Sequence, residues 1–285
     1  MRLANSHKKI LITGANGQLG TAFKVAQSHY TAFECVFASK EVLDVTSPIS
    51  IENAIQAHQP DIIVNTAAYT AVDAAETHEV DAYRLNQEGV RLLATLCASY
   101  KIALIHISTD YVFDGTSTIP YVEEITPNPQ TVYGKSKLAG ELAIQDIDDL
   151  TYAIIRTSWL YSDYGQNFYK TMVRLGTERD EISVVNDQHG IPTLADDLAK
   201  AIFKMIPQLE HSNRGVYHYS NTGITTWYAF AKAIFKHSKI DIKVNPISTN
   251  EYPTAAKRPM YSILNCTKII ENFGVSRPHW EDKLS

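Results

Sequence analysis

A tyrosine and a lysine one helical turn apart are the residues of this chain best suited to chemistry. Tyr133 and Lys137 lie in a segment with helical character, so their side chains share one face. A phenol with a pKa near ~10 exchanges protons poorly at neutral pH, and a neighbouring ammonium favours its ionised form. We therefore expect Tyr133 to give a proton to a carbonyl oxygen as hydride reaches the carbon. Taken alone, the pair also fits an ordinary surface helix.

Hydroxyl side chains follow an apolar run that is typical of a buried strand, residues 102–107. Either Ser108 or Thr109 could donate a hydrogen bond to the same carbonyl oxygen and polarise it. Lys137 could also hold the ribose hydroxyls of a nicotinamide cofactor.

A glycine turn near the start of the chain would position that cofactor. The apolar run 10–12 leads into Gly14, Gly17 and Gly20, and a helix is expected over 19–28. The first glycine would allow a tight turn, the second a close approach to pyrophosphate, and the third close packing of helix on sheet. The helix N-terminus would then face the phosphates. The spacing is G-x-x-G-x-x-G rather than G-x-G-x-x-G, and a glycine cluster alone also fits a plain turn.

The end of the second predicted strand, residues 34–38, bears on the choice between NAD and NADP. An acidic residue at this tip would favour NAD, whereas a cation favours the 2′-phosphate of NADP. Here the strand runs into Ser39 and Lys40 with no acid at the tip, although Glu41 follows. The sequence therefore favours NADP.

Strands alternate with helices through the first half of the chain, which predicts an α/β fold with a Rossmann-type, doubly wound parallel sheet. We expect a cofactor-binding domain over 1–160, joined by parts of 180–240, and a smaller α/β substrate-binding region over 161–285. Residues 81–100 read as one amphipathic helix with Asn86 as a surface residue, and 246–259 as a loop.

Composition limits the function classes. The chain has 285 residues, of which 45% are hydrophobic, and a net charge of −5 without a basic block, so we expect neither nucleic-acid nor membrane binding. No apolar run could span a bilayer, and residues 1–9 lack the apolar core of a signal peptide. Three scattered cysteines indicate reduced thiols in a cytoplasmic protein, and the histidines show no metal-ligand spacing.

Several longer motifs, taken jointly, are more specific than any of these features. Together they resemble the extended short-chain dehydrogenase/reductases over nearly the whole chain. The resemblance implies reduction of the 4-keto group of a dTDP-linked deoxysugar by NADPH, with NADH as the alternative. The matching stretches are 12–20, 64–73, 108–114, 133–141, 156–159, 186–193 and 258–259.

The resemblance also implies roles for individual residues. Tyr133 would be the proton donor, Lys137 its partner and ribose anchor, and Thr109 the hydroxyl directed at the carbonyl. With Gly14 and Ser39 from the turn and the second strand, the expected cofactor-binding residues are Gly17, Gln18, Leu19, Asp44, Val45, Ala67, Ala68, Tyr69, Tyr133 and Lys137. The expected substrate-binding residues are Thr70, Thr109, Asp110, Tyr111, Trp159 and Arg258, with core packing as the alternative for Trp159 and a surface charge for Arg258.

Departures from the family pattern matter as well. Members that bind magnesium at a dimer contact carry a glutamate where this chain has Ala22, so we expect no metal and not that dimer, although another homodimer stays open. Tyr69 stands where a histidine is frequent, which bears on cofactor preference. Dehydratases carry Thr-Asp-Glu where this chain has Thr109, Asp110 and Tyr111. An epimerase, another keto-reductase, or a non-catalytic NADP-binding subunit like the regulatory subunit of methionine adenosyltransferase are further alternatives.

Overall fold

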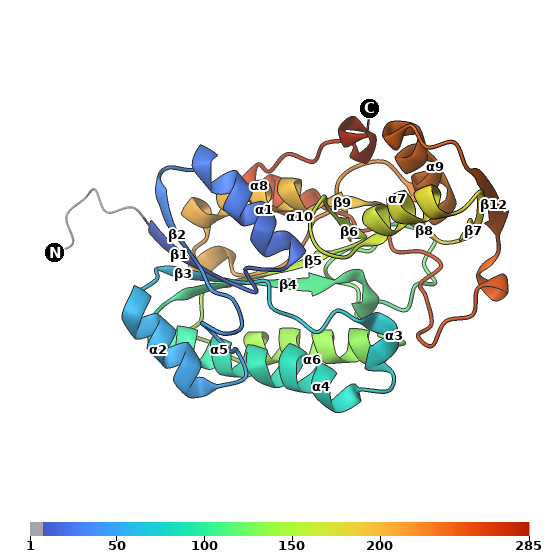
Figure 1. Ribbon diagram of the computed structural model, residues 1–285. Coiled ribbons are helices and arrows are strands. Elements are labelled where there is room, and N and C mark those ends of the chain that lie inside the picture. Colours follow the sequence, from blue (N-terminus) through green and yellow to red (C-terminus); the bar gives the residue numbers. More distant parts are fainter. Residues whose placement is uncertain (1–7, 285) are drawn as a thin grey trace.

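Six parallel strands form the central sheet of the computed structural model, which describes residues 8–284 (Figure 1). The strand order is β10-β5-β4-β3-β1-β2, so the order reverses between β1 and β3. The doubly wound parallel sheet predicted from the sequence is confirmed. The strands are β1 (Lys8–Thr13), β2 (Phe33–Phe37), β3 (Ile62–Asn65), β4 (Ala103–Thr109), β5 (Tyr152–Thr157) and β10 (Gly215–His218).

Helices cover both faces of this sheet, which explains why β3 and β5 are buried throughout and mostly apolar. On one face, Phe23 of α1 packs edge-on against Phe203 of α8, with ring centroids 5.1 Å apart. That layer contains α1 (Gln18–Ala26), α8 (Ala195–Met205) and α10 (Thr267–Phe273); the other contains α2 (Pro48–His58), α5 (Gly89–Ser99) and α6 (Val132–Gln145) (Figure 1). None of the helices described within residues 8–284 is both long and apolar enough to cross a membrane.

Elements from the second half of the chain complete the sheet and one helical layer. β10 pairs in parallel with β5 and places Val216 beside Ile154. α8 packs directly against α1, and both contribute to one hydrophobic core. The central sheet and the helical layer of α1 therefore include elements from beyond position 190.

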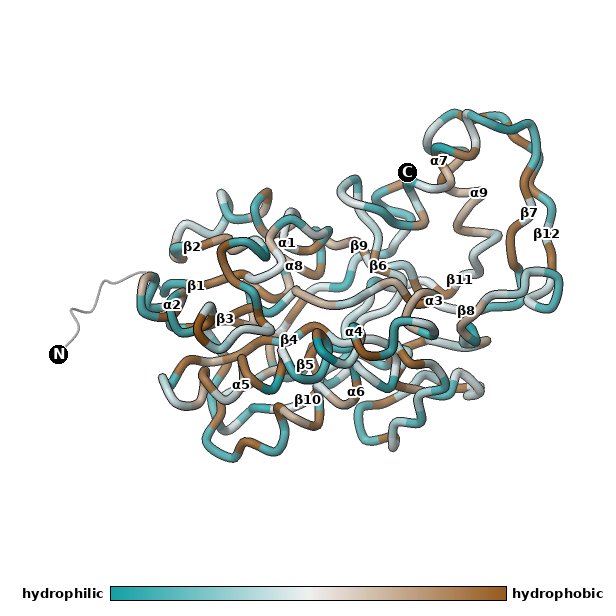
Figure 2. Tube along the Cα trace, turned by 60° about the horizontal axis from the view of Figure 1, so that its bottom comes forward, coloured by the Kyte–Doolittle hydropathy of each residue, from teal (hydrophilic) through white to brown (hydrophobic). Residues whose placement is uncertain are grey.

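A smaller region with its own core lies at the end of the molecule away from the N-terminus (Figures 1 and 2). It is built on α7 (Phe168–Glu178), α9 (Trp227–Ser238) and the parallel pair β7 (Glu181–Val185) and β12 (Lys243–Ile247). The loop expected over 246–259 is wrong at its start, because Pro246 lies within β12. A proline is tolerated here because the pair has only two strands, each with a free edge.

The helix predicted over 81–100 is interrupted. α4 (Glu79–Tyr83) passes into a single π-helical turn, 84–88, before α5 begins. Asn86 in that turn is fully buried, so the expectation of a surface residue is wrong. Its side chain accepts from the backbone N–H of Tyr69 at 2.8 Å and donates to Ser136 Oγ at 3.0 Å. π-Helical turns are frequent at functional sites, and this one fixes the loop after β3 against α6.

Short elements complete the fold: α3 (Val72–Ala75), β6 (Leu160–Tyr161), β8 (His189–Gly190), β9 (Thr193–Leu194) and β11 (Thr225–Thr226). Cys35, Cys97 and Cys266 are free thiols, and burial raises the pKa of Cys35 to about 11. Across the described part of the chain, no three histidine, cysteine or acidic side chains are grouped to hold a metal ion.

Candidate active site

The glycine turn opens a crevice at the point where the strand order reverses, which is where open α/β sheets bind ligands. Gly14 has a φ of +61°, and a Cβ there would lie 2.8 Å from the backbone nitrogen of Ala67. At Gly20 a Cβ would lie 2.6 Å from the carbonyl oxygen of Gly14, so this glycine lets α1 pack closely against the turn itself. Gly17 is the N-cap of α1 and offers no side-chain cap, which leaves the first amides of the helix available to an anion.

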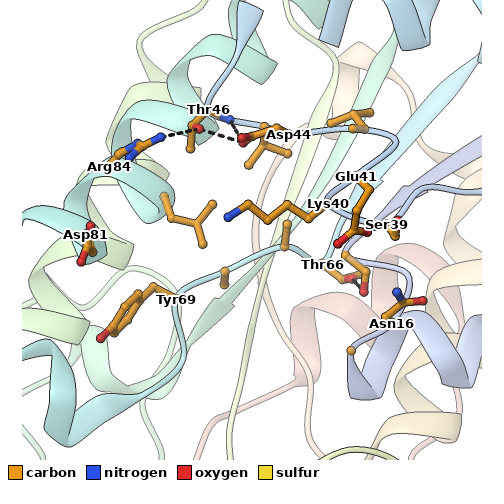
Figure 3. A pocket seen from close by; sticks show the side chains of 17 residues that line it. Asn16, Ser39, Lys40, Glu41, Asp44, Thr46, Thr66, Tyr69, Asp81 and Arg84 are labelled. Atoms are coloured by element: carbon orange, nitrogen blue, oxygen red, sulfur yellow. Dashed lines mark hydrogen bonds between the residues drawn. The ribbon is translucent and has the colours of Figure 1, made fainter. Parts of the chain in front are cut away.

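A first pocket of about 560 Å³ lies beside this turn (Figure 3). Ser39 Oγ donates to the Glu41 carboxylate at 2.5 Å, and the Lys40 side chain reaches across the pocket. Asp44 accepts hydrogen bonds from the backbone and side chain of Thr46, which shape the loop after β2. The predicted cofactor residues that line this pocket are Gly14, Gly17, Ser39, Asp44, Val45, Ala67, Ala68 and Tyr69.

A second pocket of about 630 Å³ adjoins the first and shares Gly17 and Ala68 with it. Tyr133 and Lys137 both line it, so the structure brings the expected catalytic pair to the glycine turn. The Tyr133 ring packs edge-on against Tyr111, with centroids 5.6 Å apart. The other predicted residues on its walls are Gln18, Leu19, Thr70, Thr109, Asp110, Tyr111 and Trp159.

The pKa of Tyr133 differs from the sequence-based expectation. Burial raises this pKa above its ordinary value, and a hydrogen bond with Thr109 only partly opposes the rise. Lys137 does not lower it, because its Nζ donates instead to the carbonyl of Ile107 at 2.6 Å. Burial also lowers the pKa of Lys137 itself to about 8. The expectation of a phenol made acidic by its lysine neighbour is therefore wrong for the free protein, and Tyr133 holds its proton, as a donor must.

Of the two candidate hydroxyls, Thr109 is the better placed. Ser108 Oγ donates its proton to the buried carboxylate of Glu141, which lies away from the expected carbonyl oxygen. Thr109 Oγ1 accepts from the backbone N–H of Tyr111 at 3.2 Å and donates to Asp110 Oδ1 at 3.1 Å. Unlike Ser108, Thr109 also shares a hydrogen bond with Tyr133, so its hydroxyl lies beside the expected proton donor.

Asp110 makes the stability of the folded protein depend on pH. Burial raises its pKa from the ordinary 3.8 to about 7, so the folded protein keeps a proton that the unfolded chain loses above about pH 4. The contribution of Asp110 to the free energy of unfolding is fully present below about pH 4 and is lost as the pH rises to about 7. We expect the free energy of unfolding, measured with urea between about pH 4 and 7, to show this fall. Asp110→Asn should flatten the profile, and an unchanged slope in that variant would contradict the assignment.

A buried ion pair supports the strand ends behind these hydroxyls. Arg156 of β5 and Glu141 of α6 are 3% and 0% exposed, with Nη2 and Oε2 2.6 Å apart. Because Ser108 donates to the same carboxylate, the pair ties α6, β4 and β5 together at the residue that precedes Thr109. Both residues lie in the motifs that mark the family resemblance, which implied no role for either.

A third pocket of about 510 Å³ lies against the smaller region and shares Tyr111 with the second. Arg258 borders it, donates to the Tyr111 hydroxyl at 3.2 Å and forms an ion pair with Asp73. Trp159, at the second pocket, stacks on Trp227 with ring centroids 3.6 Å apart. Its backbone is strained, with a φ of +47°. Such strain in a bulky residue is frequent at ligand sites.

Sequence reasoning missed the residues that the second half of the chain brings to the glycine turn. Asn167 Nδ2 and Ser162 Oγ both donate to Gln18 Oε1, at 2.9 and 3.0 Å. Gly165 and Gln166 line the second pocket beside them. The run Gly165-Gln166-Asn167 carried the signals of a loop and a helix N-cap, but nothing in its pattern indicated contact with residue 18.

Comparisons with known proteins agree with this geometry. A family model described as "RmlD substrate binding domain" matches residues 8–285. The dTDP-4-dehydrorhamnose reductase of Sinorhizobium fredii is 43% identical over 282 residues, which cover 96% of this chain and 94% of the relative. A dTDP-4-keto-6-deoxy-D-glucose reductase of Streptomyces niveus is 40% identical, with 96% of this chain and 94% of the relative covered.

Solved structures place the chain in the same group. The crystal structure of dTDP-4-dehydrorhamnose reductase from Bacillus anthracis in complex with NADP matches with a TM-score of 0.92 and 42% identity. The match covers 98% of each chain. On sequence and structure alike, the chain belongs to the dTDP-4-dehydrorhamnose reductase family of oxidoreductases.

Proposed function

We propose that this protein reduces the 4-keto group of dTDP-4-dehydro-L-rhamnose to give dTDP-L-rhamnose, with NADPH as hydride donor. The observation that carries the proposal is the convergence of Tyr133, Thr109 and Lys137 on one pocket that opens from the glycine turn. The three relatives named above are reductases, which favours reduction over dehydration, epimerisation or a non-catalytic role.

The residues present fit a dinucleotide. Gly14 lets the loop after β3 approach the turn closely, Gly17 keeps the N-terminus of α1 free of a Cβ, and that uncapped N-terminus suits a pyrophosphate. The first pocket would hold the adenosine half, between Ser39, Asp44 and the loop after β3. Ala68, shared by both pockets, marks the passage toward the catalytic pair. When bound, the cofactor supplies the hydride.

The chain's own residues supply the proton and orient the ketone. Tyr133 carries a proton on Oη and lies where it can pass that proton to the oxygen formed at C4. Thr109 would donate to the same oxygen as negative charge develops on it. Lys137, held by the carbonyl of Ile107, would bind ribose hydroxyls and counter the charge left on Tyr133.

The smaller region would bind the rest of the substrate. The third pocket has apolar walls from Phe168, Met172 and Trp227, which suit a nucleoside. Arg258 borders the same pocket and could make two parallel hydrogen bonds to a diphosphate. Tyr111 touches both pockets and would lie against the sugar between them.

A direct assay tests this assignment. Purified protein, enzymatically prepared dTDP-4-dehydro-L-rhamnose and NADPH or NADH are mixed, and nicotinamide absorbance is followed. We expect NADPH oxidation and dTDP-L-rhamnose as the product. Absence of oxidation with either cofactor would overturn the proposal. Turnover of dTDP-4-keto-6-deoxy-D-glucose alone would keep the reductase chemistry and change the substrate.

Cofactor choice depends on Lys40. Its side chain reaches across the first pocket, next to Ser39 at the end of β2, where a 2′-phosphate would lie (Figure 3). We expect Lys40→Met to raise the KM for NADPH about tenfold and to leave the KM for NADH unchanged, because only NADPH carries the extra phosphate. Equal effects on both KM values would remove Lys40 from this role. Lys236, an exposed lysine of α9 outside the pocket, provides a matched Lys236→Met control.

A further inference from the structure

A row of four buried polar side chains connects the glycine turn to the catalytic lysine. Thr13 Oγ1 donates to Asn65 Oδ1 at 2.6 Å, and Asn65 Nδ2 lies 3.0 Å from His106 Nδ1. The other ring nitrogen of His106, Nε2, lies 3.2 Å from Lys137 Nζ. None of the four residues is more than 1% exposed. The row crosses the sheet from β1 through β3 and β4 to α6, and the reaction steps above use only its last member.

The hydrogen-bond donors in this row fix the protonation of His106. The backbone N–H of Ala67 donates to Asn65 Oδ1 at 3.2 Å, so the amide oxygen faces Ala67 and the amide nitrogen faces His106. An amide nitrogen can only donate, which makes His106 Nδ1 an acceptor without a proton. Burial, and then the charge of Lys137, lower the pKa of His106 well below its ordinary value, so the ring is neutral. Its single proton is therefore on Nε2 and points at Lys137.

This tautomer distinguishes the two charge states of the lysine. An ammonium group has three donors and no acceptor, so a protonated Lys137 would turn an N–H toward the Nε2–H of His106. A neutral amine has a lone pair that accepts from Nε2–H, while one of its own N–H groups donates to the Ile107 carbonyl. The contact is thus a hydrogen bond only when Lys137 is uncharged. A buried donor facing another donor is costly.

The other ionisable groups near Lys137 are Glu141 and Tyr133, and neither disfavours the charged form of the lysine as His106 does. Glu141, one turn further along α6, favours the ammonium form, but this carboxylate is already paired with Arg156 and accepts from Ser108. Tyr133, one turn earlier on α6, is neutral, because burial raises its pKa. Burial lowers the pKa of Lys137 to about 8 despite Glu141. His106, on β4, is the group whose hydrogen-bonding geometry selects against the charge.

We propose that His106 is a positioning residue that acts through Lys137: its Nε2–H opposes the ammonium form and keeps the lysine able to gain and lose a proton near neutral pH. The significance of this for turnover rests on the proposed reductase function, in which Lys137 counters the charge on Tyr133. The tautomer and the lysine titration are properties of the free protein and can be measured without substrate.

The first test reads the tautomer directly. In ¹⁵N-histidine-labelled protein without cofactor, the His106 resonances should show an unprotonated Nδ1 and a protonated Nε2 between about pH 6 and 9. His106→Gln identifies the signals by their disappearance. A proton on Nδ1, or a doubly protonated ring in this range, would overturn the proposal. Because the wild-type protein is used, this test does not depend on the folding of any variant.

The second test measures the lysine. In ¹³C-lysine-labelled protein, with the Lys137 signal assigned by Lys137→Met, the titration midpoint should lie below that of ordinary lysines. His106→Gln should raise this midpoint by about one pH unit or more, since the glutamine carbonyl can accept from the ammonium. The alkaline limb of kcat/KM should move upward by the same amount. An unmoved midpoint in folded His106→Gln protein would contradict the proposal.

His218→Gln provides a matched control, because His218 is equally buried but lies on β10, where its Nδ1 faces the carbonyl of Tyr121. This variant should leave the Lys137 midpoint in place. If the protein fails to reduce the dTDP sugar, the proposed function is lost, whereas the tautomer and midpoint measurements still decide the role of His106.

Discussion

Tyr133→Phe is expected to lower kcat by about a hundred- to ten-thousand-fold, because the ketone oxygen loses its proton donor. The Tyr133 ring contributes packing against Tyr111 that phenylalanine retains. The affinity for NADPH should stay within about twofold, because the residues of the first pocket are unchanged. Steady-state reduction of the dTDP-4-keto sugar and fluorescence titration of NADPH measure the two quantities. A kcat near that of the wild type would remove Tyr133 from the mechanism.

Tyr161→Phe is a suitable control for this substitution. Tyr161 is a buried tyrosine whose hydroxyl donates to the backbone carbonyl of Trp280 and which does not line the second pocket. Loss of that hydrogen bond should cost about 1 kcal/mol of stability while kcat stays close to that of the wild type. Comparable losses of kcat in both variants would indicate a general disturbance of structure rather than a lost proton donor.

Arg156→Met is expected to destabilise the fold by about 3–5 kcal/mol, because it leaves the buried carboxylate of Glu141 without its cation. Ser108 would still donate to that carboxylate, but one hydroxyl does not replace a guanidinium that donates through both Nε and Nη2. Urea unfolding at neutral pH measures the loss, and a change below about 1 kcal/mol would contradict it.

The double variant Glu141→Leu with Arg156→Met distinguishes two causes of destabilisation, an unpaired buried charge and a loss of packing. With both charges replaced by apolar side chains, much of the lost stability should return, because the desolvation penalty disappears with the carboxylate. Ser108 would then lack its acceptor, so the hydroxyls at the end of β4 become less well fixed. We expect kcat to recover less than stability does. Additive losses in the double variant would argue against a coupled pair.

The sequence predicted those parts of the molecule that depend on local patterns. The apolar runs predicted as strands over 34–38 and 102–107 are observed as β2 and β4, with ends that differ by one or two residues. The helix predicted over 19–28 is observed as α1, which begins one residue earlier and ends two residues earlier. The predicted site residues all line one of three adjoining pockets, because strand ends and glycine turns meet at one edge of a parallel sheet.

Features that depend on distant residues were not predictable in this way. The burial of Asn86 follows from the close crossing of α6, where a Cβ on Gly140 would lie 2.1 Å from the Asn86 carbonyl oxygen. The pKa of Tyr133 follows from burial and from the direction that Lys137 takes toward Ile107. Neither spacing nor residue type reports which carbonyl a lysine will reach, so the expected phenol–ammonium coupling was wrong.

The late position of β10 in the chain has a consequence for how the protein forms during synthesis. Many proteins fold domain by domain from the N-terminus as they leave the ribosome. Here β5 keeps an open edge until residues 215–218 have been made, and α1 lacks its neighbour until α8 follows residue 194. The nascent N-terminal portion would expose an apolar face and an unpaired strand during that interval, which is when the chain is most prone to aggregate.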